Sequence, residues 1–207
     1  MKNTFIKICG IKTSQDALTS IDNGADAIGF IQTKESSRFI SLEGLNLIKK
    51  VIGNEHLTVP VFVNPTKSEV DSFLNIFPNS IIQFHGEEDI LFCSSFKKQF
   101  IKAINFKNKS DLIDKFKIYK EAFAFLVDSG NPENRGGTGD SFDWKLIPKE
   151  LEQKIIIAGG LDSNNIHSLF EILTPFGVDV SSGVESIKGV KDLLKIKNFI
   201  DKVRNYE

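Results

Sequence analysis

The sequence predicts an α/β protein folded as a single closed (β/α)₈ barrel, a TIM barrel, over residues 1–207. Short apolar runs alternate with longer amphipathic stretches from end to end, and eight such pairs follow one another. Strands that alternate with helices pair in parallel through right-handed crossovers. The chain is 41% hydrophobic and has no linker or low-complexity tract, which indicates one core and one domain.

An open doubly wound sheet is the alternative fold for such an alternation. Those sheets usually have about five or six strands. The first predicted strand here is not followed by a G-x-G-x-x-G motif. Eight units in a chain of this length therefore favour the closed barrel, which starts at about 200 residues.

The strands are predicted from the apolar runs, and the first helix from its spacing. Within residues 13–23, Ala17, Leu18 and Ile21 recur at helical spacing, and Gly24 provides a stop. The strands are predicted over residues 5–9, 27–31, 59–63, 80–84, 100–104, 123–127, 154–157 and 178–180.

The second helix begins after Ser41, a residue type that favours the N-cap position. It places Leu45, Ile48 and Ile52 on one stripe that can face the barrel. The other helices are predicted over residues 68–77, 88–99, 110–119, a short segment around 143–144, 164–173 and 193–203.

Composition excludes several classes of protein. The 26 Lys and Arg residues balance 27 Asp and Glu residues, for a net charge of −1, and a general nucleic-acid binder usually has a basic surplus. No apolar run approaches the roughly 18 residues of a membrane span, and the N-terminal apolar run is too short for a signal peptide. Two cysteines form no disulfide framework. We expect a cytoplasmic protein, and a monomer because no helix face is strongly apolar.

In this fold the active site lies at the carboxyl ends of the strands, and Cys9 ends the first one. Strand alternation points Ile6 and Ile8 towards the helices, and therefore Lys7 and Cys9 into the barrel. A cation near a thiol lowers its pKa, which would supply thiolate near neutral pH. The alternative is a buried structural cysteine, which is our interpretation of Cys93.

Asp128 ends the sixth predicted strand, after a run of Phe and Leu residues. Apolar surroundings raise the pKa of a carboxyl group and suit it to acid catalysis. The alternative is an Asp that caps its own loop through an Asx turn.

Glycine clusters follow the last three strands. Backbone N–H groups after the seventh and eighth strands of such barrels commonly form a phosphate site. The candidate phosphate-binding residues are Gly137, Gly139, Gly159, Gly160, Ser181, Ser182 and Gly183.

Three further polar residues stand at strand ends or in the loops after them. Arg38 has the fork geometry to bind a carboxylate; otherwise it is a solvated surface residue. His85 can hydrogen-bond a substrate or orient a loop, and Asp179 can position a substrate or bind the Ser-Ser-Gly turn. His56 and His167 lack metal-ligand spacing.

An ordered set of short motifs resembles the phosphoribosylanthranilate isomerase family of tryptophan biosynthesis. The motifs are KICGI at 7–11, GADAIGF at 24–30, VFVN at 61–64, QFHG at 83–86, GGTG at 136–139, FDW at 142–144, AGGL at 158–161 and VDVSSGVE at 178–185.

The resemblance implies a barrel without cofactor or metal that converts N-(5-phosphoribosyl)anthranilate to 1-(2-carboxyphenylamino)-1-deoxyribulose 5-phosphate. This Amadori rearrangement is the third step from chorismate to tryptophan. The resemblance also implies that Cys9 is the general base, Asp128 the general acid and Arg38 the residue that holds the anthranilate carboxylate.

Two alternatives stay open. The related histidine-pathway aminoaldose isomerase has an aspartate where this chain has Cys9, and its substrate with two phosphates would need a second phosphate cradle. A barrel that binds a phosphorylated ligand without catalysis would keep the glycine loops but would not need Cys9 and Asp128.

Overall fold

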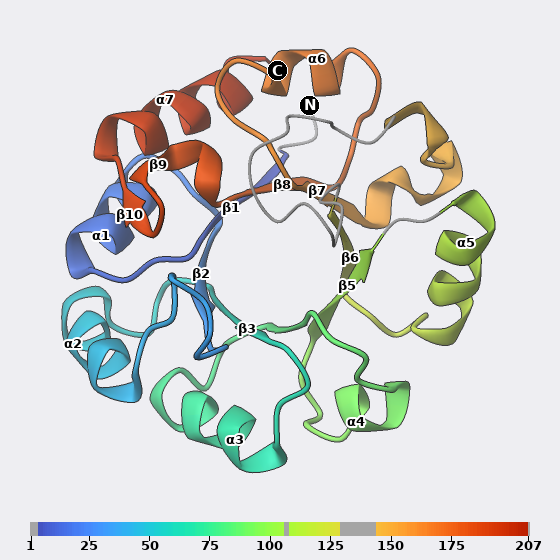
Figure 1. Ribbon diagram of the computed structural model, residues 1–207. Coiled ribbons are helices and arrows are strands. Elements are labelled where there is room, and N and C mark those ends of the chain that lie inside the picture. The colour runs from blue at the N-terminus through green and yellow to red at the C-terminus, as the bar shows by residue number, and fades with distance from the viewer. Residues whose placement is uncertain (1–3, 106–107, 129–143, 207) are drawn as a thin grey trace.

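The computed structural model describes residues 4–105, 108–128 and 144–206. Eight parallel strands form a closed barrel in the order β1 to β8, and β8 pairs with β1 to complete the ring. Figure 1 shows the ring of helices around the barrel. The predicted fold is therefore confirmed. The strands are β1 (Phe5–Cys9), β2 (Ala27–Ile31), β3 (Thr58–Phe62), β4 (Ile82–Phe84), β5 (Phe100–Asn105), β6 (Ala124–Asp128), β7 (Ile155–Ala158) and β8 (Gly177–Val180).

Every α-helix in the described part of the chain except α6 (Ile166–Phe170) begins where a polar side chain caps the first turn. Thr66 and Glu69 cap each other's backbone in a capping box, and Ser41 accepts a hydrogen bond from the N–H of Gly44 as predicted. The helices are α1 (Ser14–Asp22), α2 (Leu42–Ile52), α3 (Lys67–Ile76), α4 (Ile90–Ser94), α5 (Lys109–Ile118), α6 (Ile166–Phe170) and α7 (Leu193–Arg204).

Two helices are shorter than predicted. Helix α4 starts only at Ile90 because Asp89 caps it, and Glu88 is buried instead of continuing the helix. Helix α6 starts only at Ile166 because Asp162 accepts hydrogen bonds from the backbone N–H groups of Asn164 and Asn165. Hydrogen bonds accepted by Asp89 and Asp162 therefore set the N-terminal boundaries of the two helices. Both helices also end earlier than predicted, at Ser94 and Phe170.

Several short elements were not predicted. The short helix predicted around residues 143–144 is the 3₁₀ helix η1 (Trp144–Leu146), whereas the second 3₁₀ helix before β7, η2 (Lys149–Lys154), was not predicted. After β8 the chain makes a third, η3 (Ser182–Val184), and then an antiparallel hairpin of β9 (Glu185–Ile187) and β10 (Val190–Lys191) before α7. These elements are too short for hydrophobic periodicity to reveal them.

The core has two layers. Ile6, Ile8 and Phe30 belong to the large cluster between the strands and the helices, whereas Val59 and Leu126 belong to a smaller cluster inside the barrel. The alternation of the strands therefore works as predicted. None of the helices in the described part of the chain is long and apolar enough to cross a membrane.

Candidate active site

Cys9 and Lys7 occupy the interior of the barrel, as strand alternation predicted. Cys9 is buried, and the Lys7 side chain is fully enclosed with its Nζ 2.9 Å from Oδ1 of Asp179 on β8. Gly29 on β2 leaves room for both side chains because it has no side chain of its own. A Cβ placed there would lie 2.7 Å from the Cys9 sulfur and 3.1 Å from Lys7 Cε, so a side chain would displace them.

The predicted lowering of the Cys9 pKa is wrong in direction. Burial raises the pKa of the thiol above its ordinary value, and the charges of Lys7 and Lys191 only partly offset this effect. Asp179 adds to the rise and is itself the partner of Lys7. Cys9 is therefore a thiol at neutral pH in the unliganded protein. The sequence pattern did not reveal the contact of Asp179 with Lys7, and the role of Asp179 in positioning a substrate stays a prediction.

Asp128 and His85 face each other at the carboxyl ends of β6 and β4. His85 Nε2 lies 3.9 Å from Asp128 Oδ2, too far for a hydrogen bond, and Nδ1 lies 3.2 Å from the side-chain nitrogen of Gln83. Both facing side chains are about one-third exposed. Partial burial lowers the pKa of His85, and its interaction with Asp128 only partly opposes this. This direction favours the neutral imidazole of His85.

A buried ionic cluster supports the His85 loop. The Glu88 carboxylate accepts hydrogen bonds from Lys102 Nζ at 2.7 Å, Asn64 N at 2.8 Å and Gly86 N at 3.0 Å. Lys102 also donates to the carbonyl of Gly86. A side chain at Gly86 would collide with Asn64. The cluster joins the loops after β3 and β4 to β5. Sequence reasoning missed it, because Glu88 looked like a helix residue.

Arg38 is part of a second ionic cluster. Its Nε and Nη2 donate to the two carboxylate oxygens of Glu185 at 2.6 and 2.8 Å. Glu185 also accepts from Gly189 N at 3.1 Å and Lys191 Nζ at 3.2 Å. Burial works in the opposite direction, but the Arg38 and Gly189 hydrogen bonds and the Lys191 charge lower the pKa of Glu185 to about 2. The unpredicted β9–β10 hairpin thus carries Glu185, the partner of the Arg38 guanidinium, together with two further partners of Glu185.

The pair with Glu185 uses one edge of the guanidinium. An Arg side chain has five N–H donors, and a side-on pair engages Nε–H and one Nη–H. The other edge, with an N–H of each terminal nitrogen, keeps the geometry for a second carboxylate. Arg38 is only partly buried, with 22% of its side chain exposed. Its position in the loop after β2 is therefore compatible with ligand binding at the rim.

The loops after β7 and β8 approach each other closely. Gly159 and Gly160 have positive φ angles of 83° and 64°, which favour glycine. A side chain at Gly183 would collide with the carbonyl of Leu161, so the two loops meet backbone to backbone. Ser181 lies between β8 and η3, and Ser182 is the first residue of η3. The predicted residues Gly137 and Gly139 lie outside the described residues.

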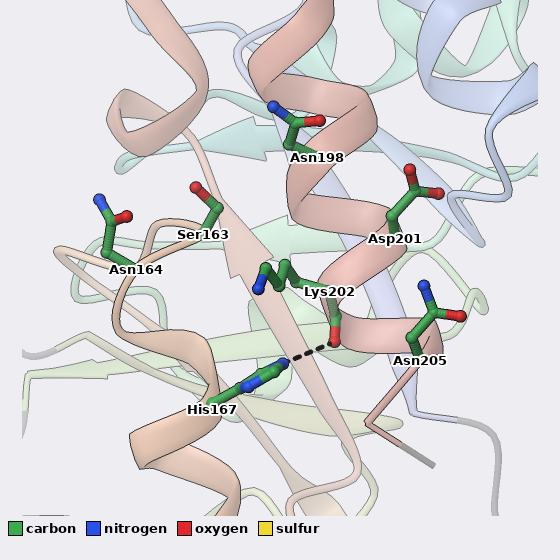
Figure 2. A pocket seen from close by; sticks show the side chains of 7 residues that line it. All are labelled: Ser163, Asn164, His167, Asn198, Asp201, Lys202 and Asn205. Atoms are coloured by element: carbon green, nitrogen blue, oxygen red, sulfur yellow. Dashed lines mark hydrogen bonds between the residues drawn. The ribbon is translucent and has the colours of Figure 1, made fainter.

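A hollow on the outer surface lies away from the strand ends. Figure 2 shows its polar lining from α6, α7 and the loop before α6, where His167 Nε2 lies 3.3 Å from the carbonyl of Lys202. The hollow encloses about 540 Å³. It contains none of the predicted site residues, and the described residues include no cluster of three or more His, Cys, Asp or Glu side chains suited to a metal.

Known proteins match this chain over nearly its whole length. The sequence profile of N-(5'-phosphoribosyl)anthranilate (PRA) isomerase matches residues 6–202. The N-(5'-phosphoribosyl)anthranilate isomerase of Hahella chejuensis is 41% identical over 207 residues, which cover 100% of this chain and 97% of the relative. That of Legionella pneumophila strain Corby is 43% identical over 195 residues, 94% of each chain.

Solved structures agree with this. The crystal structure of phosphoribosyl anthranilate isomerase from Thermotoga maritima has a TM-score of 0.87 and 36% identity, and the match covers 98% of this chain and 99% of that one. A phosphoribosyl anthranilate isomerase in complex with reduced 1-(o-carboxyphenylamino)-1-deoxyribulose 5-phosphate has a TM-score of 0.83 and 34% identity, at the same coverage. The chain belongs to the N-(5'-phosphoribosyl)anthranilate isomerase family.

Proposed function

We propose that Cys9 and Asp128 are the general base and general acid for the isomerisation of N-(5'-phosphoribosyl)anthranilate by this chain. The family is that of an aldose–ketose isomerase of tryptophan biosynthesis. The observation that carries the assignment is that a thiol and a carboxyl group end two strands of one barrel, at the rim where such barrels bind substrates.

The chemistry requires one acid and one base. Asp128 delivers a proton to the furanose ring oxygen, the bond from C1 to that oxygen breaks, and an iminium forms between C1 and the anthranilate nitrogen. Cys9, as thiolate, then removes the C2 hydrogen, and the electron pair moves through C1 to nitrogen. The enolamine becomes the ketone when the C2 hydroxyl loses its proton and C1 gains one. The iminium is the electron sink, so this route requires no metal or cofactor.

The resting thiol fits this order of events. Burial keeps Cys9 protonated in the unliganded protein. A positive charge nearby lowers a thiol pKa. The iminium forms next to the carbon from which the base takes its proton. Its charge favours loss of the thiol proton to solvent, and the resulting thiolate then removes the C2 hydrogen.

Binding groups flank the reacting atoms. The free edge of Arg38 holds the anthranilate carboxylate, while His85 hydrogen-bonds the substrate beside Asp128. The glycine and serine loops after β7 and β8 bind the phosphate, together with Gly137 and Gly139. Binding energy from both ends orients the sugar between acid and base. The partner is thus one small phosphorylated sugar amine, and we expect a cytoplasmic monomer.

Turnover of the two variants tests the roles. Cys9→Ala and Asp128→Asn should each lower kcat by about 10²- to 10⁴-fold. The loss of substrate fluorescence reports the rearrangement directly. Cys93→Ala is the matched control, because Cys93 packs between barrel and helices and should leave kcat unchanged. Wild-type turnover by either test variant would contradict its assigned role.

Substrate choice tests the two alternatives. The wild type should convert phosphoribosylanthranilate and leave the histidine-pathway aminoaldose unchanged. Conversion of the second substrate alone would favour the histidine-pathway assignment. Tight binding of a product analogue without turnover of either substrate would favour a binding protein.

A further inference from the structure

We propose that Lys7 and Asp179 act as an opposed charge pair on Cys9, in which Lys7 stabilises the thiolate and Asp179 destabilises it. The inference deepens the proposed function, since it rests on Cys9 as the base. It makes Lys7 and Asp179 positioning residues that act through Cys9. Neither needs to touch the substrate.

The pair is built into the strand register. Lys7 and Asp179 lie directly opposite each other on β1 and β8, and their side chains meet inside the barrel at 2.9 Å. Lys7 has no exposed side-chain area, and Asp179 has 9%. A buried lysine is costly unless it is paired. Burial works to lower the pKa of Lys7, yet the charge and hydrogen bond of Asp179 raise it, so Lys7 stays charged.

The lysine runs alongside the thiol. Cys9 is two residues further along β1, on the same face, and pairs with Gly29 across β2. A Cβ at Gly29 would touch both the Cys9 sulfur and Lys7 Cε, which shows that these two atoms border the same small space. The end of the lysine side chain therefore lies beside the sulfur with no side chain of β2 between them, and its charge acts on the thiol.

The other charges near Cys9 are largely committed elsewhere. Lys191 on β10 and Arg38 in the loop after β2 also act on Cys9 electrostatically, but both are paired with Glu185. His85 is the further titratable group of this region: the charges of Lys7 and Asp179 act on it, and its side chain faces Asp128. The Lys7–Asp179 pair thus has no net charge, and its two members have opposite effects on the ionisation of Cys9.

Opposite signs separate this role from a structural one. If the pair only holds the barrel together, removal of either charge disturbs the same contact, and any change at Cys9 has the same direction. If the pair tunes Cys9, Lys7→Met makes the thiol harder to ionise and Asp179→Asn makes it easier.

The test is the pH dependence of Cys9 alkylation by iodoacetamide, followed by mass spectrometry in a Cys93→Ala background. The midpoint of the rate profile reports thiolate formation and does not depend on how easily the reagent enters. The midpoint should rise by at least about one pH unit in Lys7→Met and fall by a similar amount in Asp179→Asn. Each shift corresponds to a tenfold change in the ionisation constant of the Cys9 thiol. Asp71→Asn, on the exposed α3 pair with Lys67, is the control and should not move it.

Midpoints that move together, or stay within a few tenths of a unit of the parent, overturn the inference. If Lys7→Met does not fold, Asp179→Asn decides alone: a lower midpoint supports the proposal, and an equal or higher one refutes it. These midpoints do not depend on turnover. Full activity of Cys9→Ala would therefore refute the base role, whereas the alkylation profiles still decide whether the pair acts on the thiol.

Discussion

Replacing Lys102 by methionine should lower the free energy of unfolding by about 3 kcal/mol. The methionine side chain is similar in length and apolar, so the space stays filled, while Glu88 loses its buried cation. Removing one partner of a buried pair typically costs about 3–5 kcal/mol. The lower end applies because the backbone N–H groups of Asn64 and Gly86 still bind Glu88.

Urea unfolding measures this loss, with an unchanged slope as the sign that the unfolded state is the same. The double variant Lys102→Met/Glu88→Gln should regain about 1–2 kcal/mol, since the unpaired charge is gone. Lys67→Met removes the exposed partner of Asp71 and should cost less than about 1 kcal/mol. If Lys102→Met costs no more than Lys67→Met, the buried cluster does not stabilise the fold in the way argued.

Three further outcomes are expected. Gly29→Ala should lower kcat about 10²-fold by displacing the Cys9 sulfur, with wild-type kcat as the contrary result. Glu185→Gln should have a lower free energy of unfolding than wild type above about pH 4.5, where the Glu185 carboxylate is ionised in both the folded and the unfolded state. Because the folded pKa of Glu185 is about 2, the difference between the two proteins in urea unfolding should shrink as the pH falls towards 2. Arg204→Met removes bonds to Thr4, Gly24 and Asp26 and should cost about 1–3 kcal/mol in the same assay; no loss would show these bonds to be negligible.

Periodicity was sufficient to predict the barrel. Each strand has an outward apolar face, as at Ile6 and Ile8, and each following helix has a matching stripe, as at Leu45 and Ile48. This repeated pattern leaves few topologies once right-handed crossovers are required. The inward direction of Lys7 and Cys9 followed from the same alternation.

Features that depend on distant contacts were not predictable. Glu88, which the sequence pattern places in a helix, instead forms an ion pair with Lys102, 14 residues away. Arg38 forms an ion pair with Glu185, 147 residues away. The sign of the Cys9 pKa shift was also missed, because local sequence shows the cation two residues away but neither the depth of burial nor Asp179. Charges on neighbouring strands become visible only when the register is known.

Closure of the ring has a consequence for synthesis on the ribosome. Strand β1 pairs on one side with β2 but on the other with β8, which contacts it from 172 residues further along the chain. At about 5–20 residues per second, translation of that interval takes roughly 10 to 30 s. Throughout this time the nascent first strand has an open edge, a site for misassociation that chaperones commonly protect. Among the eight barrel strands, the strand that carries Cys9 is thus made first and is among the last to be fully paired.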